Sequence, residues 1–184
     1  MGLTNQSVGK AAVDCGIDIN KKDPQDIVVA LAGNPNVGKS TVFNALTGMR
    51  QHTGNWPGKT VTSAVGFAHA ENQGYIIADL PGSYSLSAHS AEEEVTRDFI
   101  LAGEADVTVV VCDGTCLERN LILALQILAV TSRVVICVNL LDEAKKKHIE
   151  IDLSALSEKL GVPVVGTSAR KRTGLLELLR AVKE

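Results

Sequence analysis

The sequence predicts an α/β fold of three layers, in which helices cover both faces of a mostly parallel, six-stranded sheet with one antiparallel strand at its edge. Two observations support this prediction. Short, β-branched and almost unbroken apolar runs recur along the chain, as expected for strands that are covered on both faces. Stretches with helical patterning separate these runs, and such alternation is typical of α/β proteins.

The expected elements follow one another in order from residue 27 onward. The runs at 60–70 and 75–79 flank the turn sequence ENQG and predict a hairpin, which supplies the antiparallel edge strand. Asp152 and Ser154 are both suitable helix caps, and Gly161 ends the same helix. We expect strands at 27–32, 60–70, 75–79, 107–113, 133–139 and 163–167, and helices at 39–46, 90–101, 117–130, 152–160 and 174–182.

Length, charge and hydropathy limit the classes of protein to which this chain can belong. Its 184 residues are the size of one domain, and we interpret residues 1–26 as a polar N-terminal extension and 27–184 as that domain. The 18 basic and 21 acidic residues give a net charge of −3, which argues against a protein that coats nucleic acid. No apolar stretch approaches the roughly 20 residues that span a bilayer, and the opening residues lack a secretory core, so we expect a soluble, cytosolic chain.

The strongest motif is GNPNVGKS at 33–40, which fits the phosphate-loop pattern G-x-x-x-x-G-K-[ST] between a predicted strand and a predicted helix. Glycine is needed because backbone N–H groups must wrap closely around a phosphate, and the helix start adds partial positive charge. We expect Lys39 to contact the β- and γ-phosphates and Ser40 to bind magnesium. The alternative, a glycine-rich turn with an incidental lysine, does not explain the strand and helix context. The residues expected to surround the phosphates are Gly33, Asn34, Pro35, Asn36, Val37, Gly38, Lys39, Ser40 and Thr41.

A second motif, DLPG at 79–82, follows the predicted strand at 75–79. Asp79 then lies at the carboxyl end of a strand, where ligands of open α/β sheets bind. We expect Asp79 to hold magnesium through water and the Gly82 N–H to bond the γ-phosphate, so that hydrolysis releases the segment that follows. Taken alone, DLPG is equally well explained as a turn that ends a strand.

Two further motifs, NLLD at 139–142 and TSA at 167–169, indicate a base site. Guanine presents N1–H and an exocyclic amine side by side, so an ionised Asp142 accepts both hydrogen bonds, whereas adenine leaves the carboxylate unpaired. Asn139 would brace the loop, and the Ala169 N–H, next to Ser168, would meet the guanine carbonyl oxygen. Each motif is common by chance, but their order at the ends of successive strands predicts a site for GTP and GDP.

Together these motifs resemble the translation-factor-related (TRAFAC) class of P-loop GTPases. Three longer stretches narrow the resemblance: QHTGNWPGKTV at 51–61, the run at 79–99, and LERNL at 117–121. They resemble the N-terminal cytosolic G domain of the bacterial ferrous iron transport protein B (FeoB) family, over residues 27–183. The resemblance implies a three-layer P-loop GTPase fold of the Ras-like type and an enzyme that hydrolyses the phosphoanhydride of GTP slowly.

The resemblance also assigns two switch segments. Thr60 would be the switch I threonine that reaches magnesium and the γ-phosphate, with switch I at 51–62 and switch II at 82–94. Glycine and proline around Trp56 favour a mobile, non-helical loop. A buried Trp56 in the core is the alternative, because the single tryptophan of a chain is often buried.

Catalysis is expected to depart from the Ras-like pattern, because DLPG is followed by the short Ser83 and not by a glutamine that orients water. A related subset of GTPases uses a potassium ion held by a phosphate-loop asparagine, and Asn36 occupies that position. Such an ion supplies positive charge to the transition state. An Asn36 that only forms a turn is the alternative. The expected catalytic residues are Lys39, Thr60, Asn36 and Gly82, with magnesium at Ser40, Thr60 and Asp79 and potassium at Asn36.

Members of the family continue past the G domain into a helical segment that tunes GDP release and a membrane permease for ferrous iron. The resemblance therefore implies three partners: guanine nucleotide, that helical segment and that permease, at the cytoplasmic face of the inner membrane. It implies no nucleic acid and leaves a homo-oligomer open. Because the chain ends directly after its last predicted helix, we expect an isolated domain that hydrolyses GTP and moves no iron.

Three rival interpretations share part of this chemistry. A soluble GTPase of ribosome or tRNA maturation would need a basic RNA-binding module. A nucleotide-dependent binding module would dock a partner with its switches, and hydrolysis would be incidental. A P-loop kinase would explain the phosphate loop but not NLLD and TSA.

Overall fold

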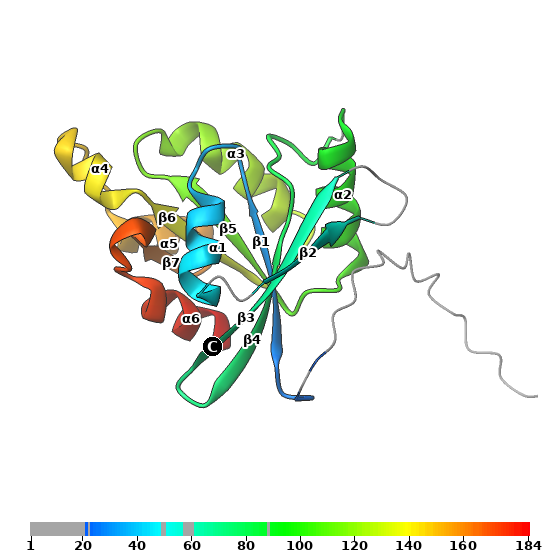
Figure 1. Cartoon of the computed structure of the whole chain (residues 1–184). Helices are drawn as coiled ribbons and strands as arrows, with labels where there is room; N and C mark the ends of the chain where they lie inside the picture. Colours follow the sequence, from blue (N-terminus) through cyan, green and yellow to red (C-terminus); the bar gives the residue numbers. More distant parts are fainter. Residues whose placement is uncertain (1–20, 22, 49–50, 57–60, 88) are drawn as a thin grey trace, which may run out of the picture.

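One mixed β-sheet forms the centre of this computed structural model, which describes residues 21, 23–48, 51–56, 61–87 and 89–184 (Figure 1). Its strands are β1 (Ile27–Gly33), β2 (Gln51–Asn55), β3 (Thr62–Ala70), β4 (Gln73–Asp79), β5 (Val107–Asp113), β6 (Val134–Asn139) and β7 (Val164–Gly166). Their order across the sheet is β2-β3-β4-β1-β5-β6-β7. Strands β4, β1, β5, β6 and β7 run parallel to one another, whereas β3 is antiparallel to both of its neighbours.

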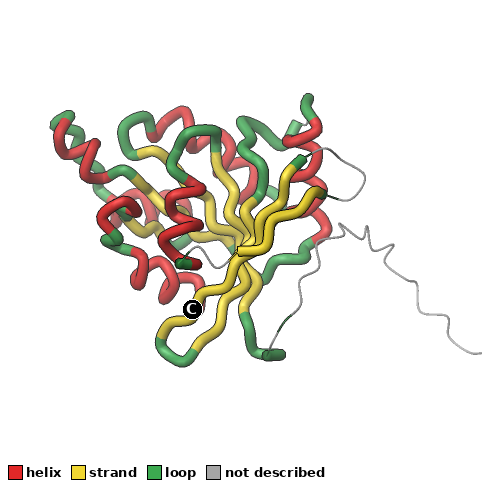
Figure 2. The backbone as a smooth tube through the Cα atoms, in the orientation of Figure 1, coloured by secondary structure: helices red, strands yellow, loops and turns green. Residues whose placement is uncertain are grey.

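Helices cover both faces of this sheet, as the tube in Figure 2 shows. Successive residues of a strand point to opposite faces. In β1, Val29 and Leu31 therefore pack into one core and Ala30 and Ala32 into the other. The first core includes side chains of α1 (Lys39–Thr47) and α6 (Leu175–Lys183), and the second includes those of α2 (Ala91–Ala102) and α3 (Leu117–Leu128). Partly buried side chains of α5 (Leu153–Leu160) pack against the second core. This arrangement confirms the predicted three-layer α/β fold.

The number of strands differs from the prediction, because β2 adds a seventh strand outside β3. The segment Gln51–Asn55 reads QHTGN and has no apolar alternation, and Thr53, Gly54 and Asn55 are exposed. Its backbone pairs with β3 from Gln51 opposite Gly66 to Asn55 opposite Thr62. A strand that is held by backbone pairing leaves no hydrophobic period to detect, so this strand, within the predicted switch I segment, was not among the predicted strands.

The predicted hairpin between β3 and β4 is confirmed, with a turn of two residues. Glu71 and Asn72 both have positive φ angles, of 50° and 62°. Two successive residues with positive φ are the mark of the tight turns whose twist matches that of the paired strands. The hairpin orients β4 so that its carboxyl end lies beside that of β1, where Ala30 pairs with Ala78.

The ends of two helices show which sequence signals for helix starts and stops predicted the structure correctly. Asp152 caps α5 by accepting a hydrogen bond from the Ala155 N–H at 2.9 Å, and Gly161 ends the helix with a φ of 69°. Ser154 lies inside the helix and is not its cap. The short helix α4 (Leu141–Lys146) was not predicted, although its acidic first turn and basic last turn complement the helix dipole.

Trp56, which follows β2, belongs to the hydrophobic core. It is 3% exposed, and its ring meets that of Phe99 on α2 edge to face, with 5.5 Å between ring centroids. The backbone N–H of Trp56 donates to the Val61 carbonyl at 2.8 Å. The structure therefore favours the core alternative for Trp56. Of the predicted switch I, residues 57–60, Thr60 among them, lie outside the described part.

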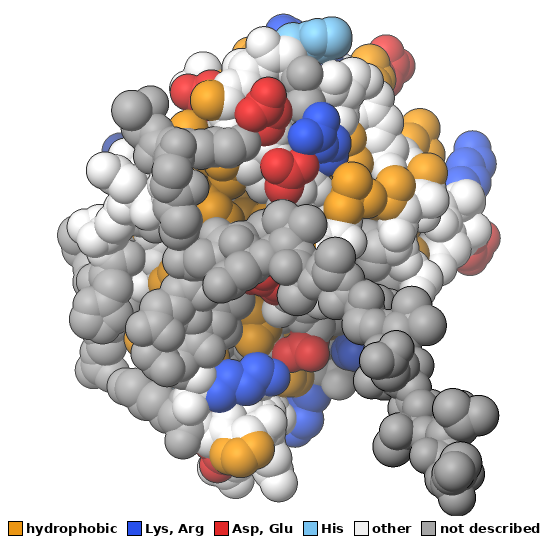
Figure 3. Space-filling model, turned by 90° about the vertical axis from the view of Figure 1, so that its right-hand side faces the viewer, with side chains coloured by type: hydrophobic (Ala, Val, Ile, Leu, Met, Phe, Trp, Pro, Cys, Tyr) orange, Lys and Arg blue, Asp and Glu red, His pale blue; other side chains and the backbone are white. Residues whose placement is uncertain are grey.

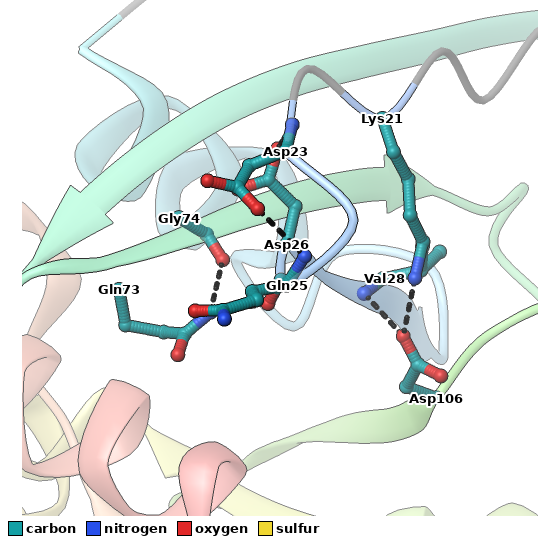
Figure 4. A network of polar contacts seen from close by, with 8 residues as sticks. All are labelled: Lys21, Asp23, Gln25, Asp26, Val28, Gln73, Gly74 and Asp106. Carbon is teal, nitrogen blue, oxygen red and sulfur yellow. Dashed lines mark hydrogen bonds and ion pairs between the residues drawn. The ribbon is translucent and has the colours of Figure 1, made fainter.

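The start of β1 is tied to its surroundings by a polar network (Figure 4). The Asp106 carboxylate accepts hydrogen bonds from the Val28 N–H at 2.8 Å and from the Lys21 ammonium at 3.3 Å. The Gln73 amide donates to the Gln25 carbonyl at 2.7 Å. The boundary between residues 26 and 27 stays a prediction. Within the described residues, no helix has both the length and the apolar character needed to cross a bilayer.

Candidate functional site

The four motifs follow β1, β4, β6 and β7, which are mutually parallel. Parallel strands present their carboxyl ends at one edge of a sheet, where ligands of open α/β sheets bind. The motifs therefore come together at this edge, although more than 120 residues of chain lie between the first motif and the last. Hydrogen bonds and ion pairs between the loops make the arrangement specific.

The phosphate loop depends on Gly38, whose φ is 80°. A Cβ at this position would lie 2.5 Å from the Asn139 side-chain nitrogen, so a larger residue would be strained and would also clash. Gly38 is the N-cap of α1, and no side chain caps the first N–H groups of that helix. The residues that carry these N–H groups line a cavity of about 480 Å³, and a helix start of this kind is a ready site for an anion. The cavity is lined by Asn34, Pro35, Asn36, Gly38, Lys39, Ser40, Thr41 and Gly82.

Lys39 and Asp79 form an ion pair that joins the phosphate loop to DLPG. Both side chains are largely buried, with exposed fractions of 10% and 14%. Burial raises the pKa of the Asp79 carboxyl above its ordinary value, and the Lys39 ammonium opposes that shift. Lys39 lines the phosphate cavity, so the pair brings an ammonium and a hard oxygen ligand together beside it, as a phosphate and a divalent metal ion require.

The DLPG turn lies directly on the phosphate loop. The Ser83 N–H donates to the Gly33 carbonyl at 3.1 Å. A Cβ at Gly82 would lie within 3.2–3.4 Å of Pro35, so the close approach of the two backbones favours glycine. Ser83 is fully buried, and its hydroxyl donates to the Ser85 carbonyl at 2.8 Å. Ser83 therefore supports the turn.

Helix α3 holds the segment that follows Gly82. The Gln126 side-chain oxygen accepts hydrogen bonds from the Leu86 N–H at 2.8 Å and from the Ser85 hydroxyl at 3.2 Å. The Arg119 guanidinium lies 4.9 Å from the centre of the Tyr84 ring. Sequence reasoning did not identify these contacts. Arg119 lies in the LERNL stretch at 117–121, so the family resemblance of that stretch was the one sequence feature that could have drawn attention to this residue.

Asn139 joins three loops and is fully buried. Its oxygen accepts hydrogen bonds from the Ala169 N–H at 3.1 Å and the Thr167 hydroxyl at 3.0 Å. Its nitrogen donates to the Val37 carbonyl in the phosphate loop at 3.2 Å. The base motifs and the phosphate loop are thus one connected structure. Thr167 belongs to the predicted TSA motif, but the sequence assigned it no role of its own.

Asp142 lies at the start of α4, and its side chain is 17% exposed. Its N–H donates to the Ser168 hydroxyl at 3.1 Å, and its carboxylate pairs with the Lys171 ammonium at 3.2 Å. Burial acts to raise the pKa of Asp142, but hydrogen bonds and the charge of Lys171 outweigh it, so the pKa lies below its ordinary value. The carboxylate therefore stays ionised at neutral pH. Sequence reasoning missed Lys171.

Three further predicted site residues are exposed to solvent. Asn36 is exposed, with a φ of 66°, and Ser40 and Thr41 are exposed at the start of α1. All three line the phosphate cavity, whereas Thr60 lies outside the described residues. A larger hollow, of about 650 Å³, lies between the start of α3 and α5 and contains no residue of the four motifs.

Comparison with known proteins agrees with this geometry. The profile of the family described as ferrous iron transport protein B matches residues 27–182. The Fe(2+) transporter FeoB of Salmonella typhimurium is 43% identical over 161 residues, which are 85% of this chain and 21% of the transporter. The chain thus spans about a fifth of the length of the relatives that it matches.

Solved structures show the same fold. The G domain of the T. maritima FeoB iron transporter is 43% identical, with a TM-score of 0.81 over 85% of this chain and 96% of that chain. The cytosolic domain of the same transporter, in a GDP form, is 42% identical, with a TM-score of 0.82 over 86% of this chain and 62% of that chain. Fold, motif geometry and identity agree, and the chain belongs to the ferrous iron transport protein B family.

Proposed function

We propose that this chain binds GTP and GDP and hydrolyses GTP slowly, as the switch domain of a ferrous iron transporter. The observation that carries the proposal is the Asn139 network, which couples the base motifs to the phosphate loop. A site for a nucleoside polyphosphate needs this coupling, because base and phosphates must be bound at a set distance. The GDP form of the T. maritima relative supports the same ligand.

The choice of guanine rests on Asp142. A carboxylate is an acceptor only, and it suits the paired N1–H and amine donors of guanine. The lowered pKa of Asp142 keeps it in the acceptor form at neutral pH. The Ala169 N–H already donates to Asn139, so its proposed bond to the guanine carbonyl would be shared or would replace that bond.

The cavity also suits the expected ions. The Ser40 hydroxyl and the Asp79 carboxylate are the hard oxygen donors that magnesium prefers, and Asn36 supplies an amide oxygen suited to potassium. When bound, magnesium and potassium would supply positive charge to the transferred phosphoryl group. Lys39 would bind the β- and γ-phosphates after it leaves Asp79, and the Gly82 N–H would hold the γ-phosphate. Thr60 is proposed from the family resemblance alone.

The wider role follows from the relatives. We propose that nucleotide state in this domain regulates iron uptake through a membrane permease and a helical segment outside this chain, at the cytoplasmic face of the membrane. The alternative of a ribosome or tRNA maturation GTPase would predict a basic RNA-binding module, and the net charge of −3 gives that alternative no support. On the face shown in Figure 3, the Lys and Arg side chains of the described residues lie among Asp and Glu side chains.

Nucleotide competition tests the proposal. We expect GDP, but not ADP, to displace a fluorescent guanine nucleotide from the chain, and we expect released phosphate to accumulate slowly with GTP. A kinase-like site would bind ADP at least as well as GDP. Equal displacement by both nucleotides would therefore contradict the proposed function.

A second prediction concerns potassium. We expect GTP hydrolysis to be faster in potassium chloride than in sodium chloride at equal ionic strength, by about tenfold or more, because positive charge at the phosphates stabilises the transition state. Asn36→Ala should remove the difference. GDP affinity, measured in both salts, is the control for intact binding. Equal rates in the two salts, unchanged in Asn36→Ala, would leave Asn36 as a turn residue.

A further inference from the structure

The contact between Lys171 and Asp142 is the feature of the site that the family motifs do not explain. Among the described residues, Lys171 is the one cation in ion-pair contact with Asp142, at 3.2 Å between Nζ and Oδ2. The Asp142 side chain is 17% exposed, whereas that of Lys171 is 60% exposed. The Lys171 ammonium thus contacts the same carboxylate that would select the base.

The loop that carries Lys171 is held by its own backbone. The short 3-10 helix η1 (Ala169–Lys171) closes with a bond from the Lys171 N–H to the Ser168 carbonyl at 2.9 Å. Ser168 in turn pairs with Thr173 through hydrogen bonds of 3.1 and 3.3 Å. This loop is therefore tied at both ends, and the Lys171 stem starts from a defined position beside Asp142.

The other basic side chains near Asp142 in the sequence or on η1 either pair with another acidic residue or are exposed to solvent. On α4, Lys146 pairs with Glu143 at 2.9 Å, and Lys145 is exposed. On η1, Arg170 is exposed. Of these charged neighbours, Lys171 is the one whose ammonium contacts the Asp142 carboxylate.

We propose that Lys171 is a positioning residue for base recognition, whose ammonium holds the Asp142 carboxylate in the orientation that receives guanine. The proposal rests on the proposed binding of guanine nucleotides. A carboxylate offers about four lone-pair positions, and the two guanine donors take one on each oxygen. A further position on Oδ2 stays available to Lys171. Without the lysine, the carboxylate would rotate more freely, because the last torsion of aspartate is broad.

The test compares variants that differ in charge at one position. Lys171→Met keeps the stem and removes the charge, and Lys171→Arg keeps the charge. Lys145→Met is the matched control, since it removes an exposed lysine from α4 without touching Asp142. We expect Lys171→Met to weaken GDP binding by about two- to fivefold at low ionic strength, as for other partly exposed ion pairs. Lys171→Arg and Lys145→Met should bind GDP within about twofold of the unaltered chain.

A double-mutant cycle separates positioning from general damage. Xanthine has a carbonyl where guanine has the amine, so Asp142→Asn should bind xanthosine diphosphate, with the amide donating to that carbonyl. In this background Lys171→Met should leave xanthosine diphosphate affinity unchanged, because the carboxylate is absent. The loss seen with GDP should also shrink in 1 M salt, which screens an exposed pair.

Three results would overturn the inference. The first is a Lys171→Met chain that binds GDP as tightly as the unaltered chain. The second is an equal loss of xanthosine diphosphate affinity in the Asp142→Asn background, which would show a structural role. The third is an unaltered chain that does not bind GDP at all, in which case the proposed function falls as well. Normal GDP binding by the unaltered chain with no effect of Lys171→Met would remove this inference alone.

Discussion

Lys39→Ala is expected to weaken the binding of GDP and GTP by about 100-fold or more. Lys39 would make charge-assisted hydrogen bonds to two phosphate oxygens, and each such bond contributes about 1.5–3 kcal/mol. Calorimetric titration of magnesium-containing protein with GDP measures the loss. A smaller effect on GMP, which lacks the β-phosphate, would locate the missing contact at the phosphates.

The ion pair with Asp79 complicates this variant and also supplies its control. Removal of Lys39 leaves a largely buried carboxylate without its cation, and a broken buried pair can destabilise a fold by about 3–5 kcal/mol. Asp79→Asn in the same chain removes that unpaired charge. We therefore expect the double variant Lys39→Ala/Asp79→Asn to recover unfolding temperature but not GDP affinity. Recovery of both would show that Lys39 acts through folding and not through the phosphates.

The sequence was most informative where function requires particular residue types at set spacings. The phosphate loop needs Gly38 in a left-handed conformation and Lys39 directly after it, so the motif and its place before a helix could be predicted together. The buried runs of β1 and β5 were equally clear, since both faces of these strands are covered. Features that depend on neighbouring residues of the chain can therefore be predicted from a single sequence.

Features that depend on distant partners were not predictable in this way. Strand β2 is a strand because its backbone pairs with β3, and its own side chains carry no pattern. Gln126 is a polar residue of α3 with no distinguishing sequence pattern, and its role depends on the hydrogen bond that it accepts from the distant Leu86 N–H. Lys171 lies 29 positions from Asp142, and nothing in the intervening sequence indicates their pairing. In each case the missing information is tertiary proximity.

Asp142→Asn is expected to change which base the site accepts. The variant replaces one acceptor oxygen by an NH₂ donor, which would face the donor amine of guanine. We expect GDP affinity to fall by about 100- to 1,000-fold, because hydrogen bonds to a charged group contribute about 1.5–3 kcal/mol each. Xanthosine diphosphate should then bind more tightly than GDP, since its carbonyl accepts from the new donor. Competition of both nucleotides against a fluorescent xanthine nucleotide measures the reversal.

Glu143→Gln is the matched control for this change. It removes one negative charge from the adjacent position of α4, where Glu143 pairs with Lys146 and not with the base loop. GDP affinity in this variant should stay within about twofold, because an exposed pair contributes about 1 kcal/mol or less. The fold of Asp142→Asn should survive for a similar reason, since its ionic partner Lys171 is 60% exposed. If Asp142→Asn kept full GDP affinity and gained none for xanthine, Asp142 would not face the base, and guanine selectivity would have to come from the Thr167 to Ala169 loop.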